Sequence, residues 1–261
     1  MNSLTSNKYQ IKLLLILIII YLLSTAIYML IPGGGIDMTA AYSDEALPDI
    51  SPILLTLANL LLVAIIYFPV GYIGISINKR TDLPGIINSQ SNPKNLYFYP
   101  LLTGIGLGLI LIIVDIATKF ISNNSGLTHP SFPSSIFASL NAGIGEEIFF
   151  RLFLMSMWVW ILTWVNTKMF PKKDYRTQIL IISNILAALG FSAGHFPTVF
   201  ALFDTTSLAE IPPVIIGEVI ILNMLVGLAA GNAFRKHGLI AASGIHFWTD
   251  IVWHVIYGLF I

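Results

Sequence analysis

Long runs of apolar residues, separated by short polar segments, dominate the pattern of this chain. A helix needs about 20 mostly apolar residues to cross the hydrocarbon core of a bilayer. Seven runs reach this length, so the pattern predicts about seven membrane-spanning helices, with eight as the upper limit. These runs lie at residues 11–31, 51–77, 97–121, 135–168, 178–203, 213–234 and 239–261.

The first run has the features of a signal peptide at its start, because Lys8 and Lys12 precede it. Its apolar stretch is longer than the usual ~7–15 residues of a signal peptide, and residues 24–28 lack a pattern of small residues for cleavage. We therefore expect a retained first membrane helix, with a cleaved signal peptide as the alternative.

Composition supports an integral membrane protein. Of the 261 residues, 56% are apolar and 10% are charged, against a usual charged share of about 25%. The predicted fold is all-α, a polytopic bundle forming one membrane domain over residues 1–261. Within it we expect accessory helices at 1–133 and a catalytic core at 134–261. The formal net charge is zero, and no basic patch indicates nucleic-acid binding. The absence of cysteine excludes disulfides and thiol catalysis.

The charged residues of the loops predict the orientation. Eleven of the thirteen basic residues lie at alternate ends of the predicted spans, whereas the opposite loops carry acidic residues. The positive-inside rule places the basic ends and the N-terminus in the cytoplasm. The basic residues are Lys8, Lys12, Lys79, Arg80, Lys94, Lys168, Lys172, Lys173, Arg176, Arg235 and Lys236. The acidic ones are Asp37, Asp44, Glu45, Asp49, Asp204 and Glu210.

Glu146, Glu147 and Arg151 lie inside the long fourth run, where each charge costs roughly 2.5–3.5 kcal/mol on insertion scales. On a helix, Glu147 and Arg151 share a face and can form an ion pair. Glu146 is rotated by about 100° from Glu147, so it can point elsewhere and act on a water molecule. The alternative is a buried ion-pair network that only fixes helix packing.

Two further pairs have the same four-residue spacing. Phe191 and His195 lie on one face of the fifth run, and Pro197 follows where the helix can distort. A histidine at the end of a membrane helix can also be merely interfacial. His246 and Asp250 share a face of the last run, which His254 continues. We expect these groups, on three separate helices, to meet the acidic groups of the fourth run at one site.

These motifs, Glu146-Glu147-x-x-x-Arg151, Phe191-x-x-x-His195 and His246-x-x-x-Asp250, resemble in order the signatures of the CAAX protease and bacteriocin-processing family, also called the Abi family. The resemblance covers residues 134–260. It implies a glutamate-dependent intramembrane endopeptidase. By this resemblance, Glu146 and His195 activate water, while His246 and residue 250 stabilise the oxyanion. Glu147, Arg151 and Phe191 support the site.

Residue 250 departs from members that act on prenylated proteins, which often have Asn there. An ionised Asp250 would repel an oxyanion, so it must either be protonated or orient His246. We expect no cofactor. The alternative is a zinc site held by Glu146, His195 and His246, with a metal-bound water as the nucleophile, as in a metalloprotease. The His-Glu-x-x-His helix of zinc proteases is absent.

The positions of the motifs along their helices conflict with simple parallel spans. At 1.5 Å per residue, His246 lies about 12 Å from the basic end of its run and Glu146 about 33 Å from Lys168. The fourth run must therefore project into the cytoplasm, tilt or break, and the site opens from the cytoplasmic side or from mid-membrane. Elsewhere we expect Asp115 to pair with Lys119 and Glu218 to be interfacial. Trp158, Trp160 and Trp164 are typical of a membrane-interface belt.

The sequence thus predicts a multi-pass protease of the cell membrane. Its partners are the lipid bilayer and a peptide or protein substrate, in bacteriocin processing, self-immunity or peptide-signal processing. The alternative is a non-proteolytic scaffold or regulator that binds another membrane protein. Transport is a weaker alternative, because we find no inverted repeats and no matching interrupted helices.

Overall fold

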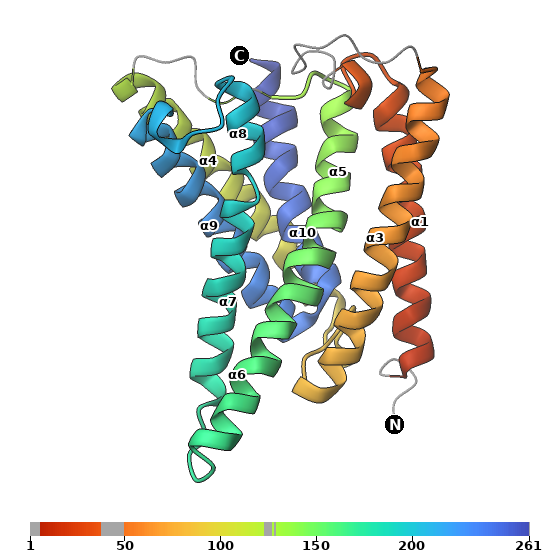
Figure 1. The fold of residues 1–261 in the computed structure, drawn as a ribbon, viewed down its shortest axis with the longest axis vertical. Helices are drawn as coiled ribbons and strands as arrows, with labels where there is room; N and C mark the ends of the chain where they lie inside the picture. The colour runs from red at the N-terminus through yellow and green to blue at the C-terminus, as the bar shows by residue number, and fades with distance from the viewer. Residues whose placement is uncertain (1–5, 38–49, 123–126, 128, 261) are drawn as a thin grey trace.

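The protein is a bundle of helices that run up and down along one common direction (Figure 1). The computed structural model describes residues 6–37, 50–122, 127 and 129–260, and no strand occurs in these ranges. Seven helical segments in them are long and apolar enough to cross a membrane, as predicted. The acidic residues Asp44, Glu45 and Asp49 lie outside the described ranges.

The first three spans alternate in direction. Helix α1 (Asn7–Leu30) runs away from the end where the N-terminus lies, and α3 (Pro52–Thr81) returns beside it (Figure 1). Ser6 and Ser51 start these helices, because each hydroxyl accepts a hydrogen bond from a backbone N–H of the first turn. The third span consists of the π-helical turn η2 (Lys94–Phe98) and α4 (Tyr99–Ser122).

The fourth span is one continuous helical segment made of α5 (Ser134–Glu147), the π-helix η3 (Ile148–Met155) and α6 (Ser156–Met169). Its lower part and the start of the next helix extend beyond the other spans at the same end of the bundle (Figure 1). The fourth run therefore projects, which was one of the three predicted solutions. This projection allows Glu146 to reach the level of His246.

The remaining spans complete the bundle around this segment. Helix α7 (Arg176–Ala193) ends just before His195, and the short α8 (Phe196–Leu202) follows with Pro197 in its first turn. The predicted distortion near Pro197 is therefore present. After η4 (Leu208–Glu210) come α9 (Pro213–His237) and α10 (Leu239–Asp250). The chain then continues through η5 (Ile251–Ile256), another π-helix, and η6 (Tyr257–Leu259).

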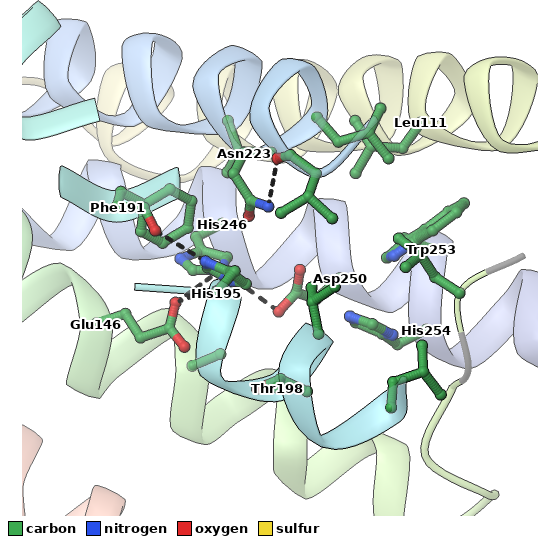
Figure 2. A pocket seen from close by; sticks show the side chains of 17 residues that line it. Leu111, Glu146, Phe191, His195, Thr198, Asn223, His246, Asp250, Trp253 and His254 are labelled. Carbon is green, nitrogen blue, oxygen red and sulfur yellow. Dashed lines mark hydrogen bonds and ion pairs between the residues drawn. The ribbon is translucent and has the colours of Figure 1, made fainter. Parts of the chain in front are cut away.

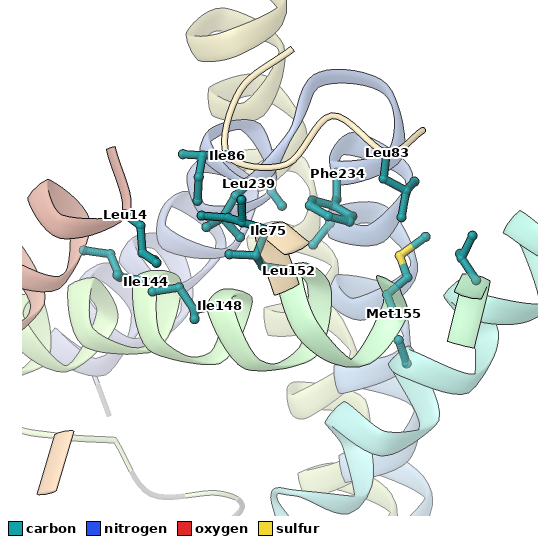
Figure 3. Close-up of a cluster of buried hydrophobic side chains, with 14 of the residues drawn as sticks. Leu14, Ile75, Leu83, Ile86, Ile144, Ile148, Leu152, Met155, Phe234 and Leu239 are labelled. Atoms are coloured by element: carbon teal, nitrogen blue, oxygen red, sulfur yellow. The ribbon is translucent and has the colours of Figure 1, made fainter. Parts of the chain in front are cut away.

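The main apolar core lies where the first, second, fourth, fifth, sixth and seventh spans meet (Figure 3). Leu14 of α1, Ile148 and Leu152 of η3, and Leu239 of α10 are completely buried there. The connection after α3 contributes Leu83 and Ile86 to the same cluster. This core holds η3 between the N-terminal helices and α10, so it fixes the height of Glu146 and Glu147 in the bundle.

Candidate active site

Glu146, His195, His246 and Asp250 meet at one end of a cavity of about 200 Å³ (Figure 2). The walls of this cavity come from α4, α5, α7, α8, α9, α10 and η5. The expectation that ionisable groups from the fourth, fifth and seventh spans converge is therefore confirmed.

Glu146 points into the cavity, with 34% of its side chain exposed. Its Oε2 lies 4.0 Å from Nε2 of His195 and 3.9 Å from Nε2 of His246. One carboxylate oxygen thus faces two imidazole nitrogens from two other helices. Glu146 is turned away from its neighbour Glu147, as the helical rotation predicted.

Glu147 points the other way, into the protein, and is completely buried together with Arg151. Its Oε2 lies 3.3 Å from Nε of Arg151, so the predicted ion pair is present. Its Oε1 lies 3.0 Å from Nδ1 of His246. This contact was not predicted from the sequence. The two residues are 99 positions apart, and local spacing carries no signal for such a contact.

His195 lies at the break between α7 and α8. Its Nδ1 is 2.9 Å from the backbone carbonyl oxygen of Phe191, one turn earlier. A carbonyl oxygen only accepts, so Nδ1 carries the proton that is donated to it. In the neutral imidazole, Nε2 is then the acceptor, and this is the atom that faces Glu146.

Phe191 is the apolar centre around which the charged groups are arranged, and 1% of it is exposed. Its ring lies edge to face against His195 and His246, with centroids 4.8 and 5.4 Å away. The guanidinium of Arg151 lies 4.9 Å from the ring centre, within cation–π range. Phe191 therefore fixes both imidazoles, which agrees with its predicted supporting position.

Asp250 lies one turn beyond His246 on α10, and its Oδ2 is 3.5 Å from Nε2 of that imidazole. Both nitrogens of His246 therefore face carboxylates, Nδ1 towards Glu147 and Nε2 towards Asp250 and Glu146. The π-helices η3 and η5 begin directly after Glu147 and Asp250. Single π-helical turns inside helices occur frequently at functional sites.

The far end of the cavity is lined by apolar side chains and by His254 (Figure 2). Nδ1 of His254 is 3.1 Å from Nδ1 of His129, which lies in the segment before α5. Burial lowers the pKa of His129 to about 4, so His129 is neutral at pH 7. We missed His129 because it belongs to no motif and lies outside the apolar runs.

Two expectations about other buried charges have different outcomes. Lys119 pairs with Asp115 at 2.8 Å, as predicted, and Tyr257 donates a hydrogen bond to the same carboxylate. For Glu218, 2% of the residue is exposed, so it faces the inside of the bundle, and its interfacial depth stays a prediction. Glu218 lies close to Asp115. The packing of α9 against α4 buries it inside the bundle.

The three motifs and the segment that carries them match one protein family. Residues 128–252 match the family model described as type II CAAX prenyl endopeptidase Rce1-like. These residues belong to the CAAX protease and bacteriocin-processing family. The family is one of proteases, so the match supports a peptide hydrolase in a multi-pass membrane protein. Searches of curated proteins and of solved structures found no match.

The family match does not reach the first three spans. The division into accessory helices at 1–133 and a catalytic core at 134–261 stays a prediction. Among the described residues, no three His, Asp or Glu side chains are arranged so that they could hold a metal ion. The choice between a metal-free and a zinc mechanism stays a prediction for the same site.

Proposed function

We propose that the chain is an intramembrane endopeptidase, with Glu146 as the base that activates the attacking water. One observation carries this proposal. In a chain from a protease family, a single oxygen of Glu146 faces Nε2 of both His195 and His246 at the end of a cavity. The substrate class is a peptide or protein associated with the membrane.

The reaction starts with a water molecule between Glu146 and His195. The separation of 4.0 Å is too long for a direct hydrogen bond, and one water can bridge the two groups. The free Nε2 of His195 accepts one hydrogen of this water. Glu146 accepts the other and takes this proton as the water oxygen attacks the peptide carbonyl.

His246 is the group that stabilises the oxyanion of the tetrahedral intermediate. This role requires a proton on Nε2, in addition to the Nδ1 proton that Glu147 holds at 3.0 Å. An ionised Asp250 cannot donate to an oxyanion. We therefore assign Asp250 as a positioning residue that holds the imidazole of His246 from 3.5 Å.

The intermediate then collapses, and the carbon–nitrogen bond breaks. Glu146 returns the proton taken from water to the leaving amine, which departs as a neutral group. The water oxygen remains on the new carboxyl group, so one water molecule is consumed for each bond cleaved. No step needs a redox partner or a covalent enzyme intermediate.

The walls beyond Glu146 fit an apolar side chain of the substrate. Leu111, Leu222 and Trp253 line this part of the cavity, and an apolar group gains free energy by leaving water there. The matching family is named for prenyl endopeptidases. Bacteriocin processing, self-immunity and peptide-signal processing stay predictions for this chain, and nothing in its sequence indicates a prenylated substrate.

The test is cleavage of a panel of membrane-associated peptides by purified protein in lipid vesicles. We expect Glu146→Gln and His195→Asn each to lower kcat by about 100-fold or more, because each removes a proton-accepting group. Glu210→Gln is the matched control, since Glu210 is exposed and lies outside the cavity. Equal cleavage by all three variants would contradict the proposal.

The same variants decide between the alternatives. A cellular phenotype that survives both substitutions at normal expression would favour the scaffold or regulator.

A metal-free reaction predicts unchanged cleavage after treatment with a chelator. Loss of cleavage, followed by recovery with added zinc, would instead support a metal held by Glu146, His195 and His246.

A further inference from the structure

A second cavity, of about 490 Å³, lies at the end of the bundle where α1 begins and where α3 and α9 end. The connection after α3 forms one of its walls, at residues 82–85 and 87–89. The polar side chains that line it include Asn7, Asn78, Lys79, Asp82 and Arg235. This cavity shares no residue with the one that contains Glu146.

Asn78 supplies a buried donor without a partner. Only 3% of this residue is exposed, and its Oδ1 accepts a hydrogen bond from the hydroxyl of Ser156 at 2.6 Å. Within the described part of the chain, its Nδ2 has no hydrogen-bond partner. Oδ1 of Asn7, on the facing helix, is a buried acceptor without a partner. Buried polar groups normally have partners, and both side chains line the cavity, so a small rotation of each would bring its unpaired atom to a polar ligand there.

The charges of the lining favour an anion. Lys79 and Arg235 oppose the single carboxylate of Asp82, which leaves a net charge of +1 (2 − 1) on the cavity wall. Asn232 accepts hydrogen bonds from Nε and Nη2 of Arg235, at 3.0 and 2.7 Å, and so fixes this guanidinium. The cavity also lies at the basic end of the bundle, which the positive-inside rule assigns to the cytoplasm.

We propose that this cavity binds a phosphodiester or phosphate monoester that carries a hydroxyl group, as in a glycerophosphate headgroup. Arg235, Lys79 and the free amide of Asn78 donate to the phosphate oxygens, and Asn7 accepts from the hydroxyl. The group can come from an anionic lipid of the inner leaflet or from a soluble phosphate ester. Basic pockets between membrane helices on this side bind such lipid headgroups.

The position of the cavity couples its ligand to the last helix. Backbone N–H groups of Leu239 and Ile240, in the first turn of α10, donate to the carbonyls of Gly85 and Ile86 at 2.9 and 3.1 Å. The wall segment therefore satisfies donors that a helix start leaves unpaired. A phosphate group bound to this segment stabilises the start of the helix that carries His246.

The experiment is titration of full-length protein in detergent, followed by native mass spectrometry. The probes are dioleoylphosphatidylglycerol, dioleoylphosphatidylcholine and glycerol 3-phosphate, each tested separately. We expect one phosphatidylglycerol to bind in preference to phosphatidylcholine. Lys79→Ala and Arg235→Ala are each expected to weaken the first binding step about fivefold, as expected for one basic residue near a headgroup.

Lys172→Ala is the matched control, because it removes one positive charge at the same end of the bundle but outside the cavity. It should leave the first binding step unchanged. Saturable 1:1 binding of glycerol 3-phosphate, lost in the same two variants, would identify a soluble ester as the source. The proposal is overturned if neither anionic probe binds, or if all three variants bind equally to wild type.

Thermal unfolding without added lipid shows whether each variant is folded. A variant that unfolds early is replaced by Lys79→Gln or Arg235→Gln, which keep most of the side-chain volume. The affinity of this replacement for phosphatidylglycerol in the first binding step is then compared with that of wild type.

Discussion

Glu146 and Glu147 are consecutive residues of one type in opposite environments. Glu146 faces a cavity and makes no contact shorter than 3.9 Å with its two imidazoles. Glu147 is completely buried between Arg151 and His246. The rotation of about 100° per residue in a helix produces this difference. Glu146 is therefore free to react, whereas Glu147 holds other groups in place.

This difference predicts that substitution of the two glutamates has unequal effects on stability. Glu147→Gln leaves the buried guanidinium of Arg151 without its carboxylate, and breaking a buried pair in this way costs about 3–5 kcal/mol. Glu146→Gln breaks no such pair, so its effect on stability is expected to be below about 1 kcal/mol. Denaturant unfolding in detergent micelles measures both, and equal losses would contradict these assignments.

At the scale of residues, the sequence predicted contacts within a helix and the convergence of the three motifs, but not which side chains of different helices form a hydrogen bond. The pairs Glu147–Arg151, Asp115–Lys119 and His246–Asp250 are present, because four-residue spacing brings side chains together on any helix. The bond between Glu147 and His246 depends on how two distant helices pack. The burial of Glu218 could not be predicted for the same reason, since it depends on a neighbouring helix.

At the scale of elements, α4 holds α10 through two glycines of its contact face. A Cβ on Gly104 would lie 2.6 Å from Cβ of Trp248, and one on Gly108 would lie 2.5 Å from Cβ of Val252. A Cβ on Gly106 would meet nothing within 4 Å. The spacing of four between Gly104 and Gly108 is typical of closely packed membrane helices.

These glycines provide a matched prediction. We expect Gly104→Ala to destabilise the bundle by about 1–3 kcal/mol through overpacking, and to lower peptide cleavage because α10 carries His246. Gly106→Ala should be neutral or more stable by up to about 1 kcal/mol, because alanine favours a helix. Thermal unfolding and the cleavage assay measure the two effects. A Gly106→Ala variant that loses as much activity as Gly104→Ala would refute the packing argument.

The π-helices η3 and η5 could not be predicted at this scale. Periodicity of apolar positions identifies a helix but does not distinguish a few π-helical turns within it, since the apolar runs continue unchanged through residues 148–155 and 251–256. The pair His246–Asp250 lies within α10, whereas Arg151 lies in η3 and still pairs with Glu147 at 3.3 Å. The change from α-helix to π-helix, at residue 148 in the fourth span and residue 251 in the last, is seen only in the structure.

For the whole molecule, the number of spans followed from the length of the apolar runs, and their mutual arrangement did not. Seven segments are present in the part of the chain that the structure describes, each within a few residues of its predicted ends. Three ways of bringing Glu146 level with His246 were open from the sequence. The structure shows the projecting fourth segment, because the position of a helix along the membrane normal depends on its neighbours.

The orientation of the helices in the membrane is a prediction about the whole molecule. The chain has no cysteine, so single cysteines introduced at Lys172 and Thr206 report on opposite ends without background. Both positions are exposed. In intact cells a membrane-impermeant maleimide should label Thr206→Cys and leave Lys172→Cys unlabelled, and lysis should expose both. Labelling of Lys172→Cys alone in intact cells would reverse the predicted topology.

The lower end of the bundle is uneven, because the α6–α7 hairpin extends well past the turn between α9 and α10 (Figure 1). A flat membrane surface cannot follow both heights. With the tryptophans of α6 at the headgroups, the turn at Gly238 would lie beneath the level of the phosphates. Water or a lipid headgroup would then fill that hollow, on the side of the bundle where α9 and α10 meet.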